Sequence, residues 1–228
     1  RSVWKRMRET SRIPIFRALK VFFDLLCHSF AWTYDGVAAV VSLGRWKGWV
    51  YSVIPFLNGP RILELGYGPG HLQLQLLARH LDVYGLDESP QMGQQARHRL
   101  AAASFSPHLA RGKAEALPYP SGQFNDVVAT FPSEYIARPE TLAEIYRVLQ
   151  PDGRLVILLA AWITDKSTRE RIAAWLFRIT GQVPTSDAVF EKALEPLAAA
   201  HFAAALNWTE VDSSRLLVIT AIKTESIR

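Results

Sequence analysis

The feature that most constrains this chain is a set of three alternating glycines, Gly66, Gly68 and Gly70, directly after a short apolar segment. Residues 61–65 suit a strand buried on both faces, as in a parallel sheet, and leucines crowd the helical pattern that follows. Glycine lets a backbone turn sharply and approach a ligand with no Cβ in the way. The free N–H groups of the helix behind the turn can hold a carboxylate, a phosphate or sugar hydroxyls. We therefore predict a strand, a ligand-binding turn and a helix.

The spacing of the glycines separates two classes of ligand. A dinucleotide fingerprint has glycine at its first, third and sixth positions, but the sixth position here is His71. The glycines instead occupy the first, third and fifth positions, and Glu64 stands two residues before the first. Residues 82–87 form a second predicted strand, which ends in Asp87, 17 residues after Gly70. A carboxylate at that strand end can accept hydrogen bonds from both hydroxyls of a ribose.

This E-x-G-x-G-x-G run resembles the first motif of class I S-adenosylmethionine-dependent methyltransferases. Residues 113–126 resemble the segment of that family that usually reads Gly-Asp-Ala-Glu-x-Leu-Pro-Phe and ends in Phe-Asp, where the acid and the next backbone amide read the adenine edge. Lys113 replaces that acid, so the resemblance implies an adenine contact only from the Ala114 backbone, while Glu115 either compensates or faces solvent. Tyr34-Asp35 and a downstream tryptophan resemble the cofactor-covering region of the ubiquinone/menaquinone-biosynthesis type.

The resemblance implies a doubly wound, Rossmann-like α/β fold with seven mostly parallel strands in the order 3-2-1-4-5-7-6. The junction at residues 212–214 requires an antiparallel hairpin for the last strands, because a parallel crossover takes a dozen or more residues. We divide the chain into a helical extension over residues 1–58 and a methyltransferase domain over residues 59–228. The other expected strands lie near 108–112, 125–130, 154–159, 204–211 and 215–224, and the expected helices near 139–149, 167–180 and 187–200.

The resemblance also implies S-adenosylmethionine as the cofactor, with S-adenosylhomocysteine as its product. Ser89 is suited to cap the helix after the second strand, and Met92 is able to pack on adenine. The expected cofactor-binding residues are Tyr34, Glu64, Gly66, Tyr67, Gly68, Gly70, Asp87, Glu88, Met92, Ala114, Glu115 and Thr130.

The loop after the fourth strand is expected to border the transferred methyl group, because ligands of open α/β sheets bind at strand carboxyl ends. Its expected substrate-binding residues are Phe131, Pro132, Glu134 and Tyr135. Methyl transfer from a cation needs little activation, so alignment and desolvation of the reactants can suffice, and no catalytic residue is assigned. Glu134, Tyr135 and Tyr34 are candidate bases if the acceptor must lose a proton, and an ordinary structural role is equally open for each.

Charge and composition limit the kinds of partner that this chain can have. The net charge is +5, but residues 1–20 carry seven basic groups and one acid, which leaves 19 basic against 20 acidic residues elsewhere. A nearly neutral body does not suit a nucleic-acid substrate, so we predict a small or lipid-like acceptor. The single cysteine, Cys27, excludes an intramolecular disulfide and indicates a reducing cytoplasm, and the six scattered histidines predict no metal. The oligomeric state is not predicted.

The segment ahead of the glycine turn predicts an amphipathic helix over residues 15–30. Its apolar run is too short to span a bilayer, and we expect no transmembrane helix or signal peptide. We favour a helix that docks on the domain, with a lid or a peripheral membrane contact through the basic arm as the alternative. The aromatic residues between 32 and 58 either cover the cofactor or anchor the helix to the sheet.

Two other functional classes stay open. A nicotinamide-dependent oxidoreductase could use the same architecture, although His71 at the sixth position and the terminal hairpin disfavour it. A non-catalytic binder of an adenosyl ligand, or a membrane-associated module, would keep the glycines and Asp87 but offer no access to a second substrate.

Overall fold

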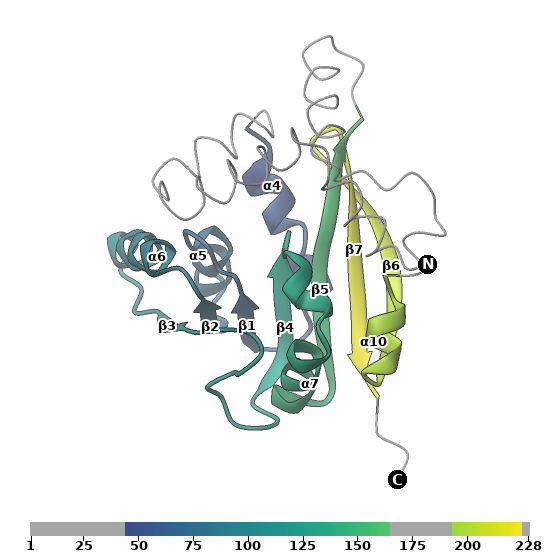
Figure 1. Cartoon of the computed structure of the whole chain (residues 1–228). Coiled ribbons are helices and arrows are strands. Elements are labelled where there is room, and N and C mark those ends of the chain that lie inside the picture. The colour runs from purple at the N-terminus through teal and green to yellow at the C-terminus, as the bar shows by residue number, and fades with distance from the viewer. Residues whose placement is uncertain (1–43, 165–192, 225–228) are drawn as a thin grey trace, which may run out of the picture.

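The computed structural model describes residues 44–164 and 193–224. Seven strands form one sheet in the order β3-β2-β1-β4-β5-β7-β6, which confirms the predicted order (Figure 1). The strands are β1 (Arg61–Leu65), β2 (Asp82–Asp87), β3 (His108–Arg111), β4 (Phe124–Thr130), β5 (Leu149–Ile163), β6 (Phe202–Val211) and β7 (Ser214–Lys223).

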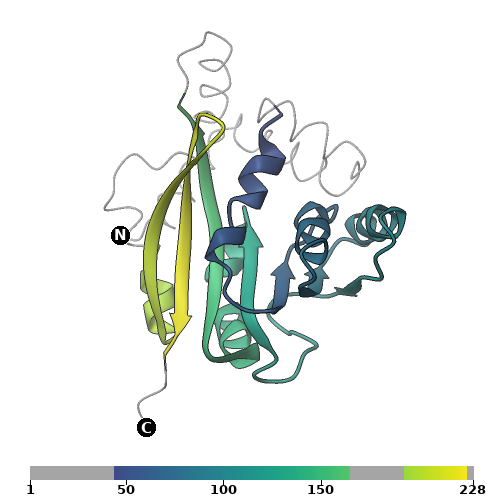
Figure 2. The ribbon, with the colours of Figure 1, turned by 180° about the vertical axis from the view of Figure 1, so that it is seen from behind.

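The helices lie on both faces of this sheet. The chain moves from β1 to β2 to β3 in one direction and from β4 to β5 in the other, and right-handed crossovers therefore place α5 and α6 on one face and α7 on the opposite face (Figures 1 and 2). The described helices are α4 (Trp46–Tyr51), α5 (His71–Leu77), α6 (Pro90–Ala102), α7 (Pro139–Val148) and α10 (Glu195–Ala199), with short 3-10 helices η2 (Ile54–Phe56) and η3 (Glu134–Ala137).

The reversal of direction falls between β1 and β4, which are neighbours. Strand β1 pairs in parallel with β2 on one side and with β4 on the other, so their carboxyl ends meet at one edge of the sheet. This edge is the topological switch point, where ligands of doubly wound sheets bind. The loops that leave β1, β2 and β4 therefore converge at one place.

The last two strands form the predicted hairpin. Strand β7 pairs antiparallel with β5 and with β6. The hairpin turns at Asp212 and Ser213, which have φ angles of 47° and 55°. Positive φ at both central residues gives a turn whose twist matches that of the flanking strands.

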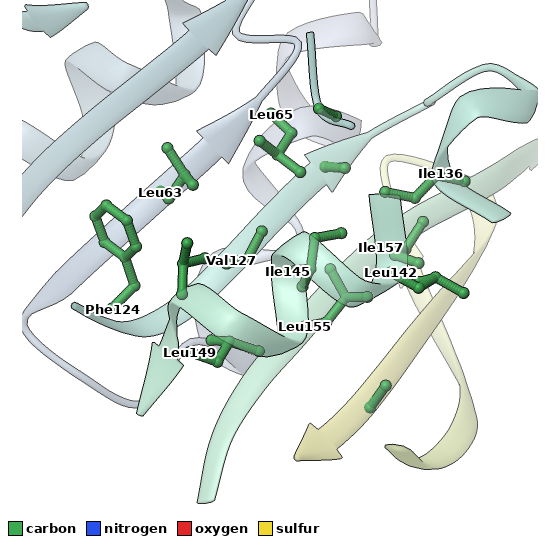
Figure 3. Packing of buried hydrophobic residues seen from close by; sticks show 14 of the residues in the cluster. Leu63, Leu65, Phe124, Val127, Ile136, Leu142, Ile145, Leu149, Leu155 and Ile157 are labelled. Atoms are coloured by element: carbon green, nitrogen blue, oxygen red, sulfur yellow. The ribbon is translucent and has the colours of Figure 1, made fainter. Parts of the chain in front are cut away.

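The core consists of one apolar cluster on each face of the sheet. The cluster on the α7 face joins Ile145 and Leu142 to inward residues of β1, β4 and β5 (Figure 3). The cluster on the α5 face includes Trp49 and Val50 of α4 together with Leu72 of α5. Helix α4 thus packs into the same core as the strands. The division of the chain at residue 58 stays a prediction.

Two elements differ from their expected bounds. Strand β5 runs to Ile163 because its pairing with β7 continues as far as Ser214. The helix expected near 187–200 is described only from residue 193 onward, where α10 begins at Glu195 with Pro196 in its first turn, the position where a helix tolerates proline. The expected helices at 15–30 and 167–180 lie outside the described residues, as do Cys27 and Tyr34. None of the helices in the described segments is long and apolar enough to cross a membrane.

Candidate functional site

The glycine turn connects β1 to α5 at the switch point. Gly66 N–H donates to the Leu86 carbonyl at 2.8 Å, which ties the turn to the end of β2. All three glycines have left-handed backbones, with φ of 69°, 53° and 81°. A Cβ on Gly70 would lie 3.0 Å from the Ala96 Cβ of α6, whereas a Cβ on Gly68 would meet nothing within 4 Å. Gly70 therefore serves close packing, and Gly68 faces open space.

Asp87 lies at the end of β2, beside the turn. One carboxylate oxygen accepts the Gly68 N–H at 2.9 Å and the other accepts the Ser89 N–H at 2.8 Å. Burial raises the pKa of the Asp87 carboxyl, and these two backbone hydrogen bonds oppose the rise. Each oxygen keeps a second lone pair, so the carboxylate can still accept hydrogen bonds from a ligand. Ser89 caps α6 by accepting from Met92 N–H at 3.3 Å, as predicted.

Glu64 lies beneath the turn, with only 1% of its surface exposed. Burial is the main cause that raises its pKa to about 8; the Gln73 amide opposes this, and the negative charge of Asp87 adds to it. Gln73, on α5, donates to Glu64 Oε2 at 2.9 Å and to the Tyr84 carbonyl at 3.2 Å. Gln73 could not be singled out from the sequence. Residues 72–76 alternate leucine with glutamine, so the pattern does not show which glutamine lies on the buried side of the helix.

The raised pKa of Glu64 predicts a specific pH dependence of stability. A carboxyl whose folded pKa exceeds its unfolded value contributes stability that is fully present below pH 4.5 and is lost as pH rises to about 8. Relative to Glu64→Gln, the wild type should lose on the order of a few kcal/mol of unfolding free energy over that window. Urea unfolding at several pH values measures this difference.

Glu140→Gln, at the exposed start of α7, is the matched control and should follow the wild-type profile. If the Glu64→Gln variant also follows the wild type between pH 5 and 8, Glu64 does not titrate in the way its burial requires.

Three other residues predicted to bind the cofactor lie near β2 and differ in their exposure to solvent. They are Tyr67, Met92 and Glu88. Tyr67 is 4% exposed, and its ring fills the space beside Gly85 and Gly93, where an added Cβ would come within 2.6 Å and 3.0 Å of it. Its side chain is therefore packed between β2 and α6. Met92 is 6% exposed in the first turn of α6, whereas Glu88 is exposed.

The loop after β3 contains the expected adenine-reading residues. Ala114 is buried, Lys113 is exposed, and Gly112 N–H donates to the Asp87 carbonyl at 3.1 Å, which holds this loop beside the end of β2. Glu115 does not simply face solvent, and its contact with adenine stays a prediction. It forms an ion pair with Arg138 at 2.5 Å.

The loop after β4 meets the glycine turn. Thr130 ends β4, and the Tyr135 hydroxyl comes within 3.3 Å of a Cβ built on Gly66. Burial, followed by the negative charges of Asp87, Glu64 and Glu115, raises the Tyr135 pKa. The phenol therefore stays protonated near neutral pH and suits a hydrogen-bond donor better than a base.

The other expected substrate-binding residues of the loop after β4 are partly packed against the protein and partly exposed to solvent. The Phe131 ring stacks on Trp46 with centroids 4.7 Å apart, Pro132 is half-buried, and Glu134 is exposed at the start of η3. The structure thus brings Glu64, Asp87, Tyr135 and the glycines together, while Tyr34 lies outside the described residues.

Two polar hollows lie at the opposite edge of the sheet. One of about 340 Å³ is lined by residues that include Arg61, Asp82 and Asn125, and a second of about 200 Å³ lies beside Asp126. Both border the amino ends of the strands, where the Asp126 carboxylate accepts the Asn58 and Gly59 N–H groups. We place the functional site at the carboxyl edge, where the glycine turn opens. Within residues 44–164 and 193–224, no cluster of three or more His, Cys, Asp or Glu side chains suits a metal ion.

Comparison with known proteins agrees with this geometry. Residues 62–153, from β1 to the first residues of β5, match the family of methyltransferase domains. These residues, which are less than half of the chain, are similar to methyltransferase domains. The match spans the glycine turn, Asp87 and the loop after β4, which are the parts of this chain that meet at the switch point.

Relatives of known name extend the likeness. A demethylmenaquinone methyltransferase of Symbiobacterium thermophilum is 34% identical over 145 residues, 60% of this chain and 58% of that protein. The ubiquinone/menaquinone biosynthesis C-methyltransferase of Geotalea uraniireducens is 28% identical over 134 residues, 55% of this chain and 57% of that protein. The chain thus matches less than two thirds of the length of either relative.

A solved structure shows the same fold. A Methanococcus maripaludis protein assigned as an S-adenosyl-L-methionine-dependent methyltransferase has a TM-score of 0.62 and 19% identity, covering 86% of this chain and 93% of that one. At this identity the likeness concerns the fold alone.

Proposed function

We propose that the methyltransferase domain binds S-adenosylmethionine at the glycine turn and transfers its methyl group to a small, apolar acceptor. The observation that carries this proposal is the pair of carboxyl groups, Glu64 and Asp87, placed around a turn whose central glycine faces open space. Both carboxyl groups have raised pKa values because they are buried. Burying two ionised carboxylates costs free energy. A cationic ligand would lower that cost, since it favours their ionised forms.

The residues present fit this cofactor. The open space over Gly68 is a cradle that a side chain would fill, and Asp87 at the adjacent strand end offers acceptors for a ribose. The ammonium and sulfonium groups of S-adenosylmethionine are positive, as the carboxyl groups require. The pyrophosphate of a dinucleotide would instead place negative charge over Glu64, and its fingerprint has glycine where this chain has His71, which disfavours the nicotinamide alternative.

The chain would contribute mainly alignment and exclusion of water. The bound cofactor supplies a methyl group on sulfur that an acceptor nucleophile can attack directly. Tyr135, whose phenol stays protonated, can donate a hydrogen bond beside the turn. If the acceptor atom must lose a proton, Glu134 is the candidate base among the described residues, because it is exposed at the start of η3.

The acceptor is inferred from the surface beside the turn. Trp46 and Phe131 give the carboxyl edge of β4 an aromatic border, which suits an apolar molecule better than a polyanion. Two matched relatives carry names of quinone biosynthesis, so we propose a quinone-like acceptor. Peripheral membrane contact through residues 1–20 and a cytoplasmic location stay predictions.

A transfer assay tests this function. Purified protein is incubated with S-adenosylmethionine labelled in its methyl group and, in separate reactions, with total RNA, DNA, protein, or a lipid and quinone extract. We expect label in the lipid and quinone fraction. Incorporation into RNA or protein alone would contradict the proposed acceptor class, and binding of the cofactor without any transfer would favour the non-catalytic alternative.

A further inference from the structure

Phe131 has a backbone conformation that its residue type disfavours. Its φ is 49°, in the left-handed region, where a bulky residue is a genuine outlier. Its N–H still donates to the Leu158 carbonyl at 2.8 Å, so the β4–β5 pairing extends one residue before the chain bends. Such outliers persist only where their surroundings hold them in place.

Helix α4 holds Phe131 in this conformation. The Trp46 ring stacks on the Phe131 ring at 4.7 Å with planes 26° apart, and Trp49 approaches the same ring at 6.3 Å. Trp49 is itself 1% exposed and packs in the cluster on the α5 face of the sheet. Helix α4 is therefore fixed to the core and presents a rigid aromatic platform to Phe131.

The loop after β4 is thus held on both faces of the sheet. Phe131 packs against the cluster that contains α4 and α5, whereas Ile136 of η3 belongs to the cluster on the α7 face (Figure 3). Between these two anchors the loop crosses the carboxyl edge of the sheet. Tyr135 lies on this crossing, with its hydroxyl 3.3 Å from a Cβ built on Gly66.

We propose that Trp46 and Phe131 are positioning residues, whose stack sets the place of Tyr135 over the glycine turn and thereby the affinity for the cofactor. This proposal rests on the proposed function and gives Phe131 a positioning role in addition to the acceptor contact expected from the sequence. It links the segment ahead of β1 to the cofactor site through the aromatic contacts of Phe131. A substitution in α4 should therefore change the affinity of the glycine turn for the cofactor, although no residue of α4 belongs to the turn.

The test measures S-adenosylhomocysteine affinity by calorimetry for Phe131→Ala, Trp46→Ala and the conservative Trp46→Phe. Because an aromatic pair contributes about 0.5–1.5 kcal/mol, we expect the two alanine variants to bind about 2- to 10-fold more weakly. Trp46→Phe, which keeps a ring on Phe131, should bind nearly as the wild type does. Trp208→Ala removes an aromatic partner of Trp162 on the β6 edge and is the control for a general loss of stability.

A double-mutant cycle shows whether Phe131 acts through Tyr135. If it does, Phe131→Ala combined with Tyr135→Phe should cost less affinity than the sum of the two single changes. Fully additive losses would overturn the proposal. So would unchanged S-adenosylhomocysteine affinity of Phe131→Ala with a raised KM for the acceptor, since that pattern marks an acceptor contact. Failure of the wild type to bind S-adenosylhomocysteine would contradict the proposed function itself.

Discussion

Replacing Gly68 with valine is expected to abolish cofactor binding. A Cβ on Gly68 meets no protein atom within 4 Å, so the added side chain would occupy only the open space over the turn. That space is where the proposed ligand lies. Calorimetric titration of the folded variant with S-adenosylhomocysteine should therefore show a loss of affinity of about 100-fold or more, equivalent to about 3 kcal/mol.

Gly122→Val is the matched control for backbone strain. Gly122 also has a left-handed φ, 66° against 53° for Gly68, and its Cβ would likewise meet nothing within 4 Å. It lies in the loop before β4, at the amino edge of the sheet. Both variants should lose thermal stability to a similar degree, because a left-handed backbone costs a side chain about 1–2 kcal/mol. Equal binding by the two variants would mean that the open space over Gly68 does not hold the cofactor.

Replacing Asp87 with alanine should weaken S-adenosylhomocysteine binding by about 30- to 1,000-fold, or about 2–4 kcal/mol. The change removes the carboxylate that would accept the ribose hydroxyls, and it also releases the Gly68 and Ser89 N–H groups. Both losses act at the carboxyl edge of the sheet, while the buried strands remain. The variant should fold, and titration after a check of its melting temperature measures the effect.

Asp82→Ala provides the comparison on the same strand. Asp82 begins β2, at the opposite edge of the sheet, and forms an exposed ion pair with Arg61 at 2.7 Å. Exposed pairs contribute little to stability, so this variant should keep wild-type affinity. Wild-type affinity in the Asp87→Ala variant would exclude Asp87 from the binding site.

The parallel half of the fold could be predicted from the sequence because its strands are buried on both faces. Continuous apolar runs, interrupted by glycines at turns, gave β1, β2 and β4 nearly their observed bounds. Glu64 and Asp87 could be singled out because each is an acid within or at the end of such a run. Their approach to the turn follows from parallel pairing, which brings strand carboxyl ends to one edge.

Contacts between distant segments could not be predicted in this way. The stack of Trp46 on Phe131 joins a helix ahead of β1 to a loop after β4, and no periodic pattern links the two residues. The ion pair of Glu115 with Arg138 is of the same kind. Gln73 has no local signal either, since the placement of α5 on the sheet decides which glutamine is buried. Packing between elements determines all three.

Calorimetric titration of the wild type with S-adenosylhomocysteine and, in parallel, with NAD tests the central claim most directly. The carboxyl groups around the turn predict saturable binding of one S-adenosylhomocysteine per chain and no binding of NAD. Burial raises the pKa of Glu64 to about 8, so its ionisation beside the positive ammonium group of the bound ligand should also release protons near pH 7, which titrations in two buffers of different ionisation enthalpy detect. Binding of NAD, or of neither ligand, would contradict the assignment of this site.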